Sequence, residues 1–261
     1  MEALNADTED PPTGARRLLG TLVAPSAPKQ TTLGAARDRA AGLVLPKGVV
    51  FLPNFLAPEV CNELVHFVDK LHSAHPLRLN KVRAPPTSAL DHGYLKCYMS
   101  FWGMEWRYLA TSSGYFLNEK VPQVPDRILE LAKEAVRKAL EKMPDAFPIP
   151  PWDGRFTCLV NYYPPKWGTL NEHADDDEPS LKEGEAFYFP VISFSLGDSA
   201  DFVLHPKDEE KVTVTLCSGD AILFGGKSRL LRHSIPAAPK TPRYTKIGLI
   251  PGRLNITLRA L

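Results

Sequence analysis

The sequence lacks the cysteine spacing of a disulfide framework or a zinc knuckle. Its 261 residues include four cysteines, which lie far apart and form no C-x-x-C pair. They are Cys61, Cys97, Cys158 and Cys217. Small disulfide-stabilised or zinc-binding domains need closely spaced cysteines, so we expect a protein of a reducing compartment. The nucleus or the cytoplasm fits this expectation.

Long apolar runs are also absent. No stretch approaches the roughly 20 apolar residues that a membrane-spanning helix needs, and we expect no membrane partner. The first ten residues, MEALNADTED, are acidic where a secretory signal is basic. The stretch from Arg16 to Arg39 contains no acidic residue before Asp38, which leaves an organellar destination open.

A strong net charge is missing as well, since 31 Lys and Arg oppose 30 Asp and Glu. Without a global positive field, any binding of nucleic acid must depend on a local patch. Arg78, Lys81, Arg83 and Lys96 are candidates for such a patch. A solvated loop would explain the same residues equally well.

Residues 1–45 indicate a disordered N-terminal tail. Prolines and small residues are scattered along it without a sustained period. Within it, Lys29-Gln30-Thr31-Thr32-Leu33 is similar to the start of a peptide that binds a sliding clamp. Ala36-Arg37 stands where the aromatic pair of such a peptide should follow, so a polar linker is the better interpretation.

Residues 46–261 are predicted to form one domain that begins with helices. A strand is expected at Val49–Phe51, and apolar stripes predict helices from Pro58 to about His72 and from about Pro125 to Met143. His66 should lie on or beside the first stripe. Between the helices we expect a basic loop at 78–92 and an extended aromatic segment at 93–106.

After Gly154 the pattern changes to short β-type runs separated by Gly, Asp and Pro turns. The expected strands are Phe156–Tyr163, Pro190–Leu196, Asp201–Leu204, Val212–Leu216, Ala221–Phe224 and Leu254–Leu258. His205 would then be an exposed loop residue. Helices followed by many short strands predict an α+β chain with a two-sheet or closed β core, such as a jelly roll, at about 155–261. We expect a monomer.

A candidate metal site comes from His173-Ala174-Asp175 and the distant His233. Two imidazoles and one carboxylate can occupy one face of Fe(II) and leave three positions open. Such openings suit an oxygenase that binds a bidentate keto acid and O₂. The alternative is a surface turn in which Asp175 caps backbone amides.

The C-terminal segment Arg253–Arg259 alternates polar with aliphatic residues. On a strand, Arg253, Asn255, Thr257 and Arg259 would share one face. Two arginines facing a β core are costly without anionic partners, and a dicarboxylate supplies two. An edge strand with a solvated face is the alternative.

Taken together, the second half of the chain resembles the AlkB family of nucleic-acid dealkylating dioxygenases. The resemblance runs from about Phe156 to the C-terminus, and looser similarity covers Phe51–Leu56 and a nucleotide-recognition lid at about 78–118. The motifs that carry it are Leu159-Val160-Asn161-Tyr162-Tyr163-Pro164, His173-Ala174-Asp175-Asp176-Asp177-Glu178, Ile192-Ser193-Phe194-Ser195-Leu196-Gly197, Ser218-Gly219-Asp220, Gly225–His233 and the terminal R-x-N-x-T-x-R. The implied fold is a double-stranded β-helix, or jelly roll, with N-terminal helices.

This resemblance implies a cofactor set of Fe(II), 2-oxoglutarate and O₂. Fe(II) would be bound by His173, Asp175 and His233. Asn161 and Tyr163 would hydrogen-bond 2-oxoglutarate. Arg253 and Arg259 would each pair with one end of it, with Asn255 nearby.

The same resemblance implies a substrate-binding set. Asp177, the candidate catalytic residue beyond the metal ligands, would face the exocyclic nitrogen of a bound base, and Glu178 would support that loop. Arg229 would approach a substrate phosphate. Trp106 or Tyr108 would stack on the base.

The implied reaction is oxidative removal of N-linked methyl groups from DNA or RNA bases. One alternative keeps the iron chemistry but acts on a protein or a lipid. Another is a non-catalytic jelly-roll binding module, for which a broken metal triad would be typical. The sequence retains all three residues of the triad.

Overall fold

A computed structural model describes residues 42–74, 78–79, 97–108, 113–116, 120–165, 168–177, 189–207, 209–237 and 252–261. The clamp-like peptide, most of the N-terminal tail, Glu178 and the basic residues Lys81, Arg83 and Lys96 lie outside this part of the chain. None of the described helices is long and apolar enough to cross a membrane.

Two long helices and a short 3₁₀ helix are present in the described residues: α3 (Pro58–Ala74), α4 (Asp126–Lys142) and η1 (Gly226–Ser228). Proline at the first position of α3 suits a helix start, because that residue needs no backbone N–H partner. The strands are β1 (Val49–Leu52), β2 (Arg78–Leu79), β3 (Tyr98–Trp102), β4 (Glu105–Tyr108), β5 (Ser113–Phe116), β6 (Phe156–Tyr163), β7 (Leu170–His173), β8 (Val191–Gly197), β9 (Ala200–His205), β10 (Val212–Leu216), β11 (Ala221–Phe224), β12 (Arg232–Ile235) and β13 (Arg253–Ala260).

The strands form two facing sheets and a small hairpin. The larger sheet has the order β1-β11-β8-β13-β6-β3-β2, the smaller one has the order β10-β9-β12-β7, and β4 pairs with β5. Each strand pair for which a register is resolved is antiparallel. This architecture confirms the predicted jelly roll with N-terminal helices.

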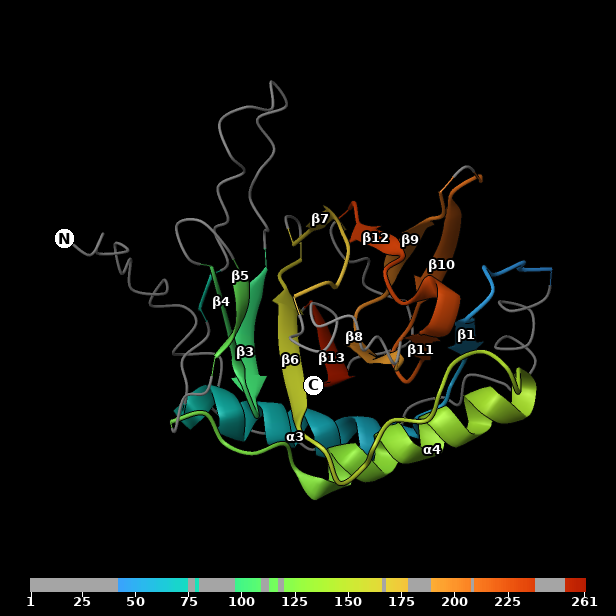
Figure 1. Cartoon of the computed structure of the whole chain (residues 1–261). Coiled ribbons are helices and arrows are strands. Elements are labelled where there is room, and N and C mark those ends of the chain that lie inside the picture. The colour runs from blue at the N-terminus through green and yellow to red at the C-terminus, as the bar shows by residue number, and fades with distance from the viewer. Residues whose placement is uncertain are drawn as a thin grey trace, which may run out of the picture.

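Both long helices cover one face of the larger sheet, and the smaller sheet lies beyond its other face (Figure 1). The core between helices and sheet contains Leu64 and Val68 of α3, Ile128 and Leu131 of α4, and inward-facing residues of the strands. Burial of these apolar surfaces is the main contribution to their packing. The predicted apolar stripes therefore face the sheet.

A second core fills the space between the two sheets. It includes Phe51, Leu159 and Phe224 from the larger sheet and Phe202 and Leu204 from the smaller one. Strand β13 separates the two cores by alternation: Leu254, Ile256 and Leu258 pack toward the helices. Its polar residues consequently face the smaller sheet.

His66 is exposed, so it lies beside the core stripe of α3 and not on it. Several other local expectations were wrong. His205 is the last residue of β9 and is partly buried, because its ring bonds to neighbouring strands. Arg78, expected in a loop, pairs as part of β2 with Met99. Strands β7 and β12 were not predicted, and they carry the two histidines of the candidate metal site.

Candidate metal centre and cosubstrate pocket

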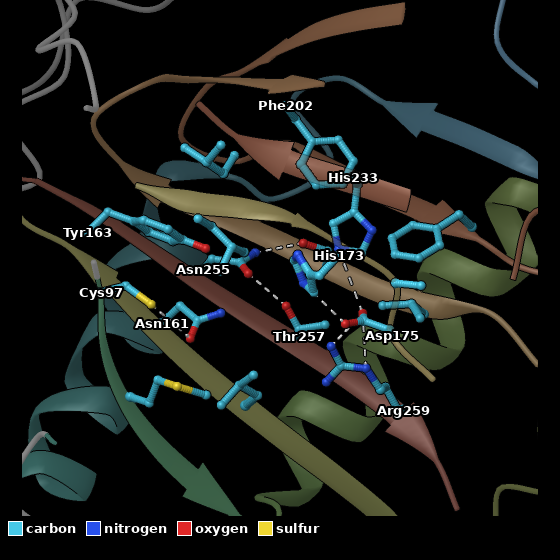
Figure 2. A pocket seen from close by; sticks show the side chains of 18 of the residues that line it. Cys97, Asn161, Tyr163, His173, Asp175, Phe202, His233, Asn255, Thr257 and Arg259 are labelled. Carbon is cyan, nitrogen blue, oxygen red and sulfur yellow. Dashed lines mark hydrogen bonds and ion pairs between the residues drawn. The ribbon is translucent and has the colours of Figure 1, made fainter. Parts of the chain in front are cut away.

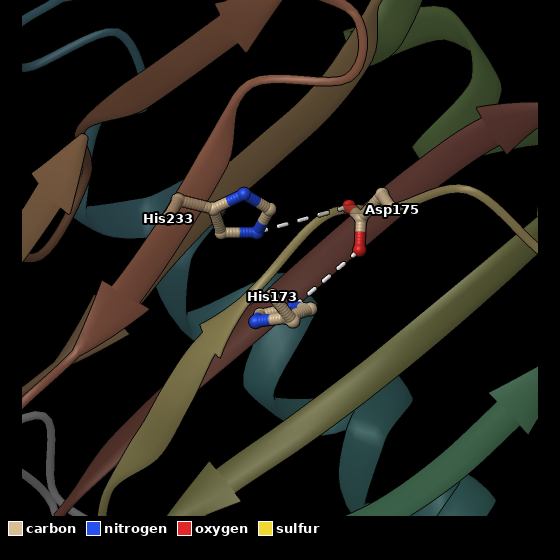
Figure 3. A group of neighbouring side chains, drawn as sticks. All are labelled: His173, Asp175 and His233. Atoms are coloured by element: carbon tan, nitrogen blue, oxygen red, sulfur yellow. Dashed lines mark ion pairs between the residues drawn. The ribbon is translucent and has the colours of Figure 1, made fainter. Parts of the chain in front are cut away.

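The smaller sheet places the two candidate histidine ligands side by side. His173 is the last residue of β7 and His233 lies in β12, where the two are paired across the strands. Their ring centroids are 4.4 Å apart. Asp175 follows in the loop after β7, and all three side chains converge (Figure 3).

Both rings are oriented by backbone carbonyls. The Nδ1 of His173 lies 2.8 Å from the carbonyl oxygen of Asn171, and the Nδ1 of His233 lies 3.0 Å from that of Leu231. A carbonyl only accepts hydrogen bonds, so each Nδ1 must carry the proton. The Nε2 lone pair of each ring is then available to a metal, which is the usual arrangement of histidine ligands.

The Nε2 atoms point at the two carboxylate oxygens of Asp175. The distances are 3.5 Å from His173 to Oδ1 and 3.9 Å from His233 to Oδ2. One ligand atom from each residue lies within 4.8 Å of the others. Two neutral imidazoles and one carboxylate form the donor set of non-haem Fe(II) sites, so the residues present fit this metal.

Electrostatics favour the metal-binding protonation states of Asp175 and His233. For His173, burial alone would lower the pKa, but the bond to Asp175 raises it above its ordinary value, so a metal ion would displace that proton. Burial alone would raise the pKa of the Asp175 carboxyl, but Arg259 and the two histidines hold it well below its ordinary value. Burial, aided by His173, lowers the pKa of His233 to about 4. Near neutral pH, Asp175 is therefore ionised and His233 is neutral.

Two arginines hold the Asp175 loop. Arg259 of β13 donates from Nε and a terminal nitrogen to Asp175 Oδ2, at 3.2 Å and 2.5 Å. Arg229, which follows η1, donates to the backbone carbonyl of Asp175 at 2.6 Å. Arg229 is 3% exposed. This position corrects the expectation that Arg229 approaches a substrate phosphate, because its side chain is buried against the metal loop.

A pocket beside the metal residues is lined by the polar face of β13 and by the facing strands (Figure 2). The solvated-edge alternative is excluded, since β13 lies between β8 and β6 and all eight of its residues are buried. The surface-turn alternative is excluded because the Asp175 side chain is 9% exposed and pairs with Arg259. Arg253 is 1% exposed. It donates to Ser195 Oγ at 2.9 Å and lies over the Tyr163 ring, 5.2 Å from the centroid.

The Nε–H of Arg253 is buried and has no hydrogen-bond partner among the residues that the structure describes. Burial lowers the pKa of this guanidinium, which means that its positive charge is poorly compensated. A buried cation with an unused donor is unfavourable unless an anion completes it. A carboxylate of 2-oxoglutarate fits this need, because guanidinium groups bind carboxylates through paired hydrogen bonds.

The remaining cosubstrate candidates line the same pocket. Asn161 and Asn255 face each other on paired strands, and Tyr163 is almost completely buried. Asn255 Nδ2 donates to Ser193 Oγ at 2.6 Å, and its Oδ1 accepts from Thr257 at 2.7 Å. These bonds make Asn255 part of the pocket's polar frame.

The candidate substrate-binding residues do not all lie in this pocket. Asp177 lines the pocket next to the metal residues. Trp106 and Tyr108 belong to the β4–β5 hairpin, on the strand that follows β3. The structure therefore brings the metal and cosubstrate candidates together with Asp177, and it locates the expected lid aromatics on a separate hairpin.

Some pocket residues were not identified from the sequence. Cys97 is buried beside Asn161. The rings of Phe202 and Phe224 flank the His233 ring, with centroid distances of 5.2 Å and 5.0 Å. Strand alternation gave a signal for the two phenylalanines, since both fall on inward positions. Cys97 precedes β3 and had no such signal.

Comparison with known proteins agrees with this geometry. The family model described as 2OG-Fe(II) oxygenase superfamily matches residues 48–259. Two similar proteins of Arabidopsis thaliana are DNA N(6)-methyladenine demethylase ALKBH1D, 31% identical over 228 residues, and ALKBH1C, 33% identical over 241 residues. The matches cover 83% and 84% of this chain but 50% and 49% of those proteins, so the chain spans about half their length.

A solved structure is similar to this chain over nearly its whole length. The structure of OsALKBH1 is 30% identical, with a TM-score of 0.66, and the match covers 84% of this chain and 99% of that one. The fold, the His-Asp-His cluster and the buried arginine strand agree with this kinship. The chain belongs to the 2OG-Fe(II) oxygenase superfamily and, within it, to the AlkB family.

Proposed function

We propose that this protein is an Fe(II)- and 2-oxoglutarate-dependent dioxygenase that removes N-linked methyl groups from nucleic-acid bases. The observation that carries this proposal is one pocket that contains both the converging triad of His173, Asp175 and His233 and the buried guanidinium of Arg253, whose Nε–H has no hydrogen-bond partner among the described residues. A metal site alone fits many reactions. A buried arginine beside it adds a place for an anionic cosubstrate.

Each part of the pocket has a separate task in this proposal. The triad binds Fe(II), and its backbone-bonded Nδ1 atoms keep the imidazoles in the ligating tautomer. Arg259 is bonded to Asp175 and so serves the metal end of 2-oxoglutarate, whereas Arg253 serves the other end. With O₂, the bound Fe(II) and 2-oxoglutarate supply the oxidant that hydroxylates an N-methyl carbon, and the hydroxymethyl group leaves as formaldehyde.

The proposed substrate is a methylated base that has left its stack, because a base within a duplex cannot reach a pocket between two sheets. Asp177, at the pocket rim, is proposed to accept a hydrogen bond from the exocyclic nitrogen of the base. The names of the two Arabidopsis relatives support N6-methyladenine in DNA as the first substrate to test.

A panel of methylated DNA and RNA oligonucleotides tests this function. The full chain is incubated with Fe(II), 2-oxoglutarate and ascorbate, and nucleosides are quantified by mass spectrometry. We expect loss of the methyl group from at least one substrate, and no loss with His173→Ala. Thr215→Val is a matched control, since Thr215 is exposed on the same sheet and its hydroxyl donates to Asp201 across β9 and β10.

The outcome that contradicts the proposal is equally specific. If no oligonucleotide is demethylated while a protein substrate is hydroxylated, the chemistry stands but the nucleic-acid assignment is wrong. If His173→Ala retains the activity of the wild type, the metal assignment is wrong.

A further inference from the structure

The outer face of the smaller sheet carries a polar cluster directly behind the metal ligands. Side chains alternate along a strand, so the neighbours of the inward-facing His173 and His233 point outward. Glu172 precedes His173 in β7, Arg232 and Ser234 flank His233 in β12, and His205 ends β9. These residues form the outer cluster: Glu172, Arg232, Ser234 and His205.

Glu172 is the centre of this cluster. One of its carboxylate oxygens accepts from Arg232 Nε at 2.8 Å, and the other lies 3.0 Å from His205 Nδ1. The backbone carbonyl of Glu172 accepts a second bond from Arg232 at 3.1 Å. His205 Nε2 lies 3.0 Å from Ser234 Oγ. One side chain of β7 is thus joined to both β12 and β9.

The backbone pairing between the two ligand strands is weak at this place. Strand β7 stands at the end of the sheet order, and its pairing with β12 consists of His233 with His173 and Ile235 with Leu170, with a register irregularity between them. Strand β12 has a regular run of three pairs with β9. A short, irregular ladder leaves the position of β7 dependent on side-chain bonds.

We propose that Glu172 is a positioning residue, which holds β7 against β12 and β9 and so sets the separation of the His173 and His233 rings for the metal. This inference rests on the metal site of the proposed function. Isolated exposed ion pairs usually contribute little. The Glu172 carboxylate differs because it bonds two neighbouring strands at once, one residue away from a ligand.

Cobalt binding to the metal-free full chain tests the proposal. Co(II) is titrated and followed by its visible absorption, which reports both the affinity and the geometry of the ligand atoms. We expect Glu172→Ala to weaken Co(II) binding about five- to tenfold, because each exposed contact of this kind accounts for up to about a fivefold change. Its cobalt spectrum should also shift, and Glu172→Gln, which retains an acceptor oxygen, should restore part of both.

Two further variants make the experiment specific. Arg232→Met removes the ion pair with Glu172 from the β12 side but leaves the His205 contact, so we expect a change in the same direction of up to about fivefold. Thr215→Val removes a 2.8 Å bond to Asp201 on the same outer face, between β10 and β9, and should match the wild type. Thermal melts of all variants check that they are folded.

The outcomes separate this inference from the function on which it rests. If the wild type binds Co(II) through His173 and both Glu172→Ala and Arg232→Met bind it with unchanged affinity and spectrum, the positioning role is overturned alone. Equal weakening by Thr215→Val would also overturn it, since any loss of cross-strand bonding would then suffice. If the wild type does not bind Co(II), or if His173→Ala binds it equally well, the metal site itself is wrong.

Discussion

Substitution of Arg253 by methionine should separate cosubstrate binding from folding. The guanidinium is 1% exposed, and among the described residues no carboxylate forms an ion pair with it. Loss of one partner of a buried charge pair costs about 2–5 kcal/mol of binding free energy. At about 1.4 kcal/mol for each factor of ten, the Kd for 2-oxoglutarate should rise about 30- to 4000-fold.

The free energy of unfolding should respond differently. In the ligand-free protein, Arg253 donates to Ser195 and contacts the Tyr163 ring, but no carboxylate of the described residues forms an ion pair with its buried charge. Replacing such a group by an apolar side chain of similar length is often neutral or stabilising. We therefore expect the free energy of unfolding of the ligand-free variant to lie within about 1 kcal/mol of the wild-type value.

Calorimetric titration of 2-oxoglutarate, with Mn(II) in place of Fe(II), measures the first quantity, and chemical denaturation measures the second. Arg253→Lys should bind with intermediate affinity, because an ammonium keeps the charge but not the paired geometry. Arg137→Met, on the exposed side of α4, is the control and should not change the Kd. An unchanged Kd for Arg253→Met would refute the assignment of this residue.

Three further predictions concern protonation, backbone and substrate. The pKa of His233 is lowered by burial and by His173 from 6.5 to about 4, so its contribution to the stability of the metal-free protein is present above pH 6.5 and is lost as the pH falls toward 4. Denaturation curves should show that the free energy of unfolding falls by about 3 kcal/mol over this range in the wild type and not in His233→Gln. Identical pH dependence of the two proteins would contradict this prediction. Gly252→Ala should lower the free energy of unfolding by about 2 kcal/mol or more, because φ is +122° and the added Cβ would lie 2.6 Å from the Tyr163 carbonyl; a Tm equal to the wild type would disprove this. Asp177→Ala should lower the rate of demethylation but leave the Kd for 2-oxoglutarate unchanged, and a matching loss of 2-oxoglutarate binding would instead show that Asp177 acts on the cosubstrate.

The residues that could be predicted from the sequence are those with a strong alternating pattern. Strand β13 was recognised because polar and aliphatic residues alternate in it, and the structure buries both faces in different cores. The stripes of α3 and α4 were recognised for the same reason. The three metal candidates were identified by residue type, although their proximity depends on the pairing of β7 with β12.

The strands that carry the ligands could not be recognised. Asn171-Glu172-His173 and Arg232-His233-Ser234 contain no apolar alternation, since their inward positions are metal ligands and their outward positions are charged or polar. The polar side chains of these strands find hydrogen-bond partners once β7 and β12 pair in the folded protein, as in the bond from Arg232 to Glu172. The same limit applies to Arg229: an arginine in a polar segment suggests a surface role, whereas the fold buries it against a carbonyl of the metal loop.

Coupled turnover is the decisive measurement for a 2-oxoglutarate-dependent demethylase. Succinate and demethylated base are measured together in one reaction of the full chain with Fe(II), 2-oxoglutarate and its best methylated oligonucleotide. We expect succinate to form with each methyl group removed, and His173→Ala and Arg253→Met to abolish or strongly reduce both products while Thr215→Val forms them at the wild-type rate. Demethylation without 2-oxoglutarate, or equal formation of both products by the His173→Ala and wild-type proteins, would contradict this expectation.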